Sequence, residues 1–229
     1  MKRIIGRKPV EAGYMKSINE IREQIESEME NIKKPLFSQE AYIADGHVIN
    51  AWLDRRWDTY AEGYLRAGHA LVEQLINTKG VDQDFLIYPI VFVYRQYLEL
   101  RLKELLRSSS TLFDESFEKK RDHKLLELWR RTRPLLERVW PESSNGWYEQ
   151  IGYRITELAT VDPDSMSTRY PDVPMRGLEY PNNYINPIHL RDVMTGISHV
   201  LEGSSIGIGE YLNAKHEMEA EYREMNEES

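Results

Sequence analysis

Residues 85–106 read FLIYPIVFVYRQYLELRLKELL, and the change of character halfway along this stretch decides the predicted fold. The first ten residues are almost wholly apolar, whereas Arg95, Glu99 and Lys103 then recur at every fourth position. Successive fourth positions on a helix drift by only about 40°, so these three residues form one polar stripe. Apolar residues cover nearly every other direction, so we expect a helix that is buried on most of its sides.

The charged stripe has two interpretations. On a helix that is packed on most sides, the stripe either forms an ordinary ion pair on a narrow solvent-facing side or lines a partly enclosed cleft. An unpaired buried ion is costly, so Arg95 and Glu99 should at least pair with each other. Both interpretations stay open at this point.

Composition limits the classes of function. The chain has 229 residues, enough to bury a core, and a formal charge of -8, so any contact with nucleic acid must be local. It has no cysteine, which excludes disulfides, thiolate nucleophiles and Cys-type zinc sites. We find neither an apolar signal region after MKRIIGRKP nor an apolar run of membrane-spanning length. We therefore expect a soluble, cytoplasmic protein that makes no membrane contact.

Helical periodicity extends over most of the chain and predicts an all-α fold with around five principal helices. The apolar residues that recur every three or four positions place helical segments, the N-terminal one included, over residues 16–34, 54–80, 89–106, 123–140, 145–158 and 188–203. We expect Pro134 to kink or split its helix, and the glycines Gly203, Gly207 and Gly209 to end the last one.

The predicted organisation has three parts. Residues 1–53 hold an N-terminal helix and a connector, residues 54–216 form the helical bundle, and residues 217–229 form an acidic tail. Between Asp162 and Pro187 five prolines stand in a polar and aromatic context, where no helix of useful length is expected. A loop this long inside a compact domain is usually either functional or disordered.

Several catalytic and cofactor motifs are missing from the sequence. There is no Glu-x-x-His or His-Glu-x-x-His, the carboxylate and histidine patterns of di-iron bundles and zincins. There is also no Walker-type phosphate loop. We therefore predict no metal and no cofactor.

Four pieces of the sequence carry a resemblance to a known family: WDTYAEGYLRAGHALVEQL, YPIVFVYRQYLELRLKELL, HKLLELW and TRYPDVPMRG. Together they resemble bacterial proteins with a HEPN-like helical core. Such proteins have a Tyr-Arg-x-Tyr-Leu-Glu-Leu-x-Leu-Lys helix, a helix start of His-(Asp or Lys)-Leu, and an Arg-Tyr-Pro turn. The resemblance covers about Trp57–Leu201, and YRQYLELRLK is its most specific part.

The resemblance implies an antiparallel HEPN-like bundle, here with an added N-terminal helix and a long proline-rich loop before the last helix. HEPN-like domains often dimerise, and they include metal-independent ribonucleases of toxin and phage-defence systems as well as inert binding modules. The implied partners are RNA or a nucleotide, a second copy of the chain, and a protein encoded in the same operon.

The ribonuclease motif of that family is not matched. The motif is Arg, four to six residues, then His on one helix, whereas Arg191 and His199 are separated by seven residues. The resemblance does imply a second polar set, made of Arg95, Glu99, His123 and Arg169. Chemically this set is sensible, because a histidine can act as acid or base near neutral pH and an arginine can hold phosphate through two hydrogen bonds.

Each candidate residue has a functional and a structural interpretation. We predict a catalytic role for His123, Arg95 and Glu99, and a ligand-binding role for Arg169, Tyr170, Lys103 and Lys120. The structural alternatives are that His123 begins a helix and that Arg169 pins the proline-rich loop by pairing with Glu99. Stacking on bases is open to a set of tyrosines, although most should be packing residues: Tyr88, Tyr94, Tyr97, Tyr170 and Tyr180.

Two functions of different class follow. The first is a HEPN-like effector that binds or cleaves RNA in a bacterial stress or phage-defence system. The second is a non-catalytic helical interaction protein or scaffold in which the polar cluster is structural. If the first holds, Arg95, Glu99, His123 and Arg169 should converge on one open pocket; if the second holds, Glu99 and Arg169 should be occluded and paired.

Overall fold

The computed structural model describes residues 18–34, 56–79, 81–117, 123–141, 146–177 and 184–227. Within these ranges the fold is all-α, as predicted, and contains no strand. The described helices are α1 (Ile18–Ile32), α2 (Trp57–Asn77), α3 (Gln83–Leu112), α4 (Leu125–Val139), α5 (Trp147–Val161) and α6 (Pro187–Glu227). The predicted connector after α1 lies outside the described residues.

The chain divides into two units, Met1–Ile49 and Asn50–Ser229. The described part of the first unit is α1, whose apolar stripe includes the exposed residues Ile21, Ile25 and Ile32. The second unit contains α2 to α6 and the whole of the buried core.

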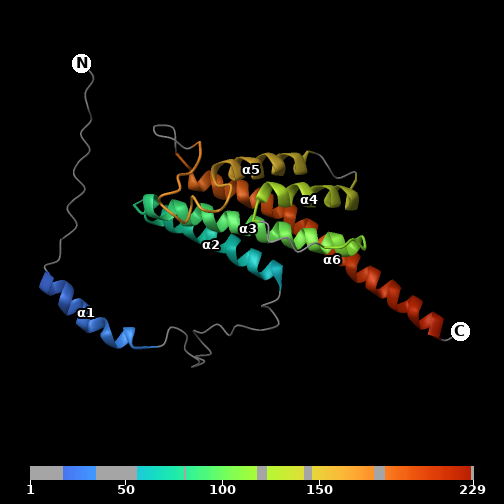
Figure 1. The fold of residues 1–229 in the computed structure, drawn as a ribbon, viewed down its shortest axis with the longest axis horizontal. Helices are drawn as coiled ribbons and strands as arrows, with labels where there is room; N and C mark the ends of the chain where they lie inside the picture. Colours follow the sequence, from blue (N-terminus) through green and yellow to red (C-terminus); the bar gives the residue numbers. More distant parts are fainter. Residues whose placement is uncertain are drawn as a thin grey trace, which may run out of the picture. The chain divides into compact units, whose positions relative to one another are not determined.

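Helix α3 is the centre of the second unit. It packs against α2, α4 and α6, while α5 packs against α4 (Figure 1). Its apolar residues are buried on several sides, as the sequence predicts for this helix, and they include Ile90, Leu98, Leu102 and Leu105. The neighbouring helices are amphipathic. In α2, for example, the buried positions Ala61, Leu65, Gly68, Val72 and Leu75 follow the three- and four-residue steps of one helical face.

Several predicted helix limits are wrong; α3, for example, ends at Leu112 and not at the predicted residue 106. Helix α3 starts six residues before Pro89. Phe85 and Pro89 are both exposed, so the backbone hydrogen bond that proline cannot donate is missing on a solvent-facing side of the helix. Helix α4 is not split at Pro134, which also lies on an exposed side. Helix α6 does not end at its glycines and continues through the predicted acidic tail to Glu227.

Packing explains why one of those glycines belongs inside α6. A Cβ atom added to Gly207 would lie 2.7 Å from Cζ2 of Trp140, so the missing side chain lets α6 approach the end of α4 closely. Apolar residues beyond Gly207 continue the inward face of the helix, with Ile208 buried and Leu212 packed on the core. The helix-breaking tendency of glycine is therefore outweighed by packing.

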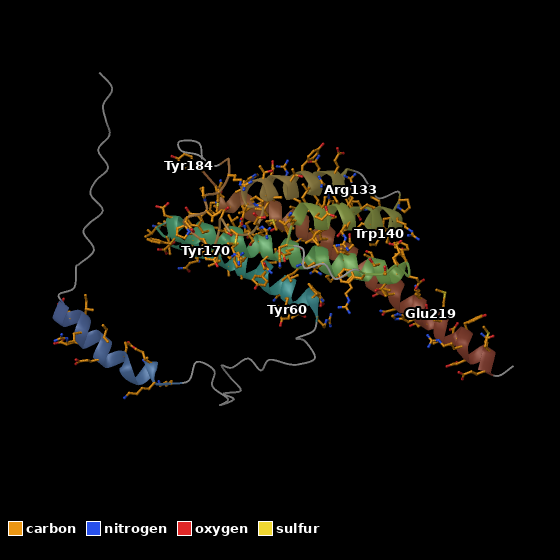
Figure 2. The ribbon with its side chains drawn as sticks, viewed as in Figure 1. Tyr60, Arg133, Trp140, Tyr170, Tyr184 and Glu219 are labelled. Atoms are coloured by element: carbon orange, nitrogen blue, oxygen red, sulfur yellow. The ribbon has the colours of Figure 1, made fainter. Side chains whose placement is uncertain are left out.

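The predicted loop before the last helix is confirmed in its described parts, because residues 162–177 and 184–186 contain no helix. The segment lies beside the ends of α2 and α3, at the end of the bundle where Tyr170 and Tyr184 are labelled in Figure 2. It is therefore a long connection that covers one end of a rigid helical scaffold.

The contact of α2 with α3 makes a test possible with two glycines of the same helix. A Cβ atom on Gly68 would clash with the buried ring of Tyr94, whereas a Cβ atom on Gly63 would meet no other group within 4 Å. We expect Gly68→Ala to lower the free energy of unfolding by about 1–3 kcal/mol. The control Gly63→Ala should raise it by up to about 1 kcal/mol, because alanine favours the helix. Urea denaturation measures both, and equal effects would contradict this packing.

Candidate functional site

The charged stripe of α3 starts at Arg95, whose side chain is completely buried. Its guanidinium group donates to Oε2 of Glu99 at 3.3 Å, so the predicted pairing of these two residues is present. The stripe therefore does not form an ordinary surface ion pair at this position. Burial lowers the pKa of Arg95, and the carboxylates of Asp162 and Glu99 oppose that effect.

Arg95 also bonds to backbone carbonyls of two distant segments. Nε donates to the Asp162 carbonyl at 3.1 Å, and Nη2 donates to the carbonyls of His123 at 2.9 Å and Pro163 at 3.1 Å. One side chain thus ties α3 to the residues just after α5 and to the residues just before α4. Arginine suits this role because its donors are fixed in one plane and point in several directions.

Glu99 lies one helical turn beyond Arg95 and is 3% exposed. Its Oε1 accepts a hydrogen bond from Nζ of Lys103 at 2.7 Å and lies 2.7 Å from Nδ1 of His123. Burial acts to raise the pKa of Glu99, but the bonds from Lys103 and His123 outweigh it, so the pKa lies below its ordinary value. Glu99 is consequently held as a carboxylate between three basic side chains.

His123 differs from the other members of this cluster because its side chain is 67% exposed. It precedes α4, which begins at Leu125, and its carbonyl is held by Arg95 while its ring is held by Glu99. A buried carboxylate that holds one ring nitrogen of an exposed histidine orients the imidazole. This arrangement can support acid–base chemistry on a group that arrives from solvent.

Asp162 is a member of the cluster that the sequence analysis missed. It is completely buried, and its carboxylate accepts bonds from the Ser167 amide at 3.1 Å and the Thr168 hydroxyl at 3.0 Å. Its Oδ2 lies 3.9 Å from Nε of Arg95. The signal was present, because an aspartate between the end of a helix and a proline is well placed to bond to the turn that follows.

Arg169 lies apart from Glu99. It is exposed, its Nε donates to the Ser165 carbonyl, and its guanidinium carbon lies 5.9 Å from the ring centre of Phe92. Its described bonds go to Ser165 and Met166, so the structural alternative, in which Arg169 pairs with Glu99, is wrong. The loop is anchored by Arg95 and Asp162 instead, and Arg169 stays exposed.

A hollow of about 650 Å³ lies beside Arg169 at the end of the bundle. The loop contributes Thr168, Arg169 and Tyr170, the first turns of α3 contribute Asp84 and Tyr88, and Tyr184 precedes α6. The tyrosines Tyr88, Tyr170 and Tyr184 are 49%, 47% and 86% exposed. The hollow thus combines one accessible cation with three accessible aromatic rings.

The predicted site residues therefore separate into two groups. Arg95, Glu99, Lys103 and His123 meet in one cluster, whereas Arg169 and Tyr170 line the hollow, in which none of those four residues takes part. Lys120 and Tyr180 lie outside the described residues. Of the remaining predicted stacking residues, Tyr94 and Tyr97 are buried in the core.

The described residues contain no group of three or more His, Cys, Asp or Glu side chains that could hold a metal ion. None of their helices combines the length and the apolar character needed to cross a membrane. Comparison of the chain with family models, with curated proteins and with solved structures finds no match.

The bonds of Arg95 predict a large effect of its removal. Arg95→Ala should lower the free energy of unfolding by about 3–5 kcal/mol, because it leaves buried carbonyls and part of a buried carboxylate unpaired. Arg95→Lys should recover little of this loss, since one ammonium group cannot reach the same acceptors. Arg154→Ala, which breaks an exposed pair with Glu157 on α5, should cost less than about 1 kcal/mol in the same urea titration. Similar losses for Arg95→Ala and Arg154→Ala would contradict the buried role.

The pKa of Glu99 predicts how stability depends on pH. Because this pKa is lower in the folded than in the unfolded protein, its contribution to stability is present above about pH 4.5 and is lost as the pH falls through the folded pKa. Glu99→Gln should therefore be less stable at neutral pH, and its stability should fall less steeply under acid. Urea denaturation at a series of pH values gives both slopes, and identical slopes would show that Glu99 does not titrate differently on folding.

Proposed function

We propose that this protein is a HEPN-like effector that binds single-stranded RNA or a nucleotide at the hollow beside Arg169, within a bacterial stress or phage-defence system. The observation that carries the proposal is the combination of one accessible arginine and three accessible tyrosines around about 650 Å³. A guanidinium group can hold a phosphate through two hydrogen bonds, and aromatic rings stack on bases without regard to sequence.

The charges around the hollow support a short ligand. Arg169 is the cation and Asp84 the carboxylate among its lining residues, and the whole chain has a formal charge of -8. Tight binding of a long phosphate backbone needs several cations along its path. The hollow therefore suits one nucleotide, or one nucleotide unit at an accessible position of a single strand.

In this proposal the Arg95 cluster positions the binding loop. Arg95 is completely buried, so it cannot touch a ligand, and its hydrogen bonds hold the backbone from which the loop departs. Asp162 fixes the next turn through Ser167 and Thr168, the two residues before Arg169. Ordering the loop in advance lowers the entropy cost of binding.

RNA cleavage is the second candidate function, and it is favoured by the environment of His123. The imidazole is exposed, Glu99 holds its Nδ1, and Lys103 bonds to the same carboxylate oxygen. A histidine held in this way can remove a proton from a ribose hydroxyl, and a neighbouring ammonium group can stabilise charge on phosphate. Arg95 and Glu99 then act as positioning residues for His123.

Binding can be tested with a fluorescent single-stranded RNA and with nucleoside monophosphates as competitors. Arg169→Ala and Tyr170→Ala should each weaken binding by about tenfold, the effect of losing one charged hydrogen bond or one stacked base. Arg154→Ala is the matched control, because it removes an exposed arginine from α5. Unchanged RNA affinity in both hollow variants would overturn the proposal.

Cleavage is tested separately with the same RNA. If His123 is catalytic, wild-type protein should cut the strand in the presence of a chelator, and His123→Ala should lose cleavage while it keeps RNA affinity. The variant retains the backbone carbonyl that accepts from Arg95, so its fold should persist. RNA that stays intact with wild-type protein would leave binding as the function and reject the second candidate.

A further inference from the structure

A second hollow lies on another side of the bundle and plays no part in the proposed RNA site. It has a volume of about 640 Å³ and is lined from α2, α3 and α6 by Glu62, Gly63, Arg66, Arg101, Glu202 and Ile206, among others. Arg101 lies two residues beyond Glu99, which on a helix is about 200° around the axis. This hollow and the Arg95 cluster therefore use opposite faces of α3.

The floor of this hollow contains polar groups that the protein does not satisfy. Arg101 is 4% exposed, and its Nε has no hydrogen-bond partner among the described residues. The same is true of Oε1 of Glu202 and of the Tyr97 hydroxyl, one turn before Arg101. Buried donors and acceptors without partners are rare in folded proteins and call for a specific explanation.

The Arg101–Glu202 pair stays open. Nη2 of Arg101 lies 3.9 Å from Oε1 of Glu202, which is too far for a hydrogen bond. Glu104 and Ser205 occupy the other side of the guanidinium group, where Nη1 donates to them at 3.3 and 3.4 Å. The Nε side of Arg101 and one oxygen of Glu202 are thus left as a donor and an acceptor next to each other.

The carboxylates at the rim have cations of their own. Arg66 donates to Glu62 at 2.6 Å, and Arg56 donates to Asp58 at 2.5 Å. Glu202 has no such close pairing, and burial raises its pKa while Arg101 opposes that effect. The hollow therefore contains a buried guanidinium group and a partly exposed carboxylate that face each other without a close hydrogen bond.

We propose that this hollow binds a small zwitterion, namely a free α-amino acid. Its carboxylate would accept a charge-assisted hydrogen bond from Nη2 of Arg101, on the side that faces Glu202. Its ammonium group would donate to the partly exposed carboxylate of Glu202. A ligand with only one of these charges would pair with only one of the two side chains, which gives the site a reason to select both charges together.

The walls leave room for an amino-acid side chain. Gly63 presents no side chain, and the space where its Cβ would stand contains no other group within 4 Å. Ile206 is 69% exposed and offers apolar surface at the rim. The hollow is thus polar at its floor and partly apolar at its edge, which is typical of small-ligand sites. Tyr60, labelled in Figure 2, marks the end of α2 that forms this wall.

Calorimetric titration of the full chain with each proteinogenic amino acid tests the proposal. At least one should bind, whereas its decarboxylated amine and its deaminated acid, which carry one charge each, should bind at least about tenfold more weakly. Absence of binding by every amino acid would overturn the proposal. Equal affinity for the amine or for the acid would also overturn it, because recognition would then not require both charges.

Variants locate the binding. Glu202→Gln and Arg101→Lys should each weaken amino-acid binding by at least about tenfold, and Glu157→Gln, an exposed carboxylate on α5, is the matched control. Gly63→Phe should block the hollow without touching the buried polar groups, which keeps the test valid if Arg101→Lys unfolds the protein. Arg169→Ala should leave this affinity unchanged, so failure of the RNA proposal remains distinguishable. Undiminished binding in Gly63→Phe or Glu202→Gln would place the amino acid elsewhere and refute the assignment.

Discussion

The placement of a guanidinium group inside the bundle is the constraint on which the second unit depends. Arg95 has no access to water, so every donor that it carries must find an acceptor within the protein. It finds them in Glu99 and in the backbone on either side of the α4–α5 pair. The position of the histidine before α4 and the course of the loop after α5 are therefore set by one side chain of α3.

The polar stripe on α3 has a structural part and a candidate functional part. Toward its buried end the stripe is fully paired and serves to hold segments together. Near the surface, the stripe contacts His123, which precedes α4. The His123 ring is oriented by Glu99, the same carboxylate that Arg95 contacts. A cluster of this kind can have a structural and a functional role at once, because Glu99 balances charge in the core and orients a side chain that is exposed to solvent.

Helix α3 also contributes side chains to two different hollows. Its first turns contribute Tyr88 to the hollow beside the loop, and its middle contributes Arg101 to the floor of the other hollow. A central helix that contacts most of its neighbours can place polar groups in several directions while its apolar residues hold the core. The two hollows differ in kind: the first is lined by accessible aromatic rings, and the second has a buried guanidinium group in its floor.

Much of the fold could be predicted from the sequence because the α-helical period is strong in α2, α3 and α4. The pairing of Arg95 with Glu99 also followed, since both the four-residue spacing and the cost of burial require it. Helix ends were predicted poorly where local rules compete with packing. Proline and glycine disfavour helix in isolation, yet solvent exposure of Pro89 and the contact of Gly207 with Trp140 outweigh that preference.

The site was predicted only in part, for a physical reason. Spacing along one helix identifies neighbours on that helix, so Lys103 could be placed beside Glu99 without coordinates. Hydrogen-bond partners on other helices and loops depend on the path of the loops in space. The spacing of apolar residues along the sequence does not encode that path. Asp162 and Tyr184 were missed for that reason, and one of the two alternatives for Arg169 gave it a partner that it does not have.

The length of α6 has a further consequence. Three glycines fall within seven residues, and each costs about 1 kcal/mol relative to alanine in a helix interior. Lys215 ties the helix to the end of α3 through the carbonyls of Thr111 and Leu112, and the helix continues past the bundle beyond this point (Figure 1). The last turns of α6 should exchange their amide protons far sooner than the core does. The C-terminal part of α6 can therefore unfold and refold while the rest of the second unit stays folded.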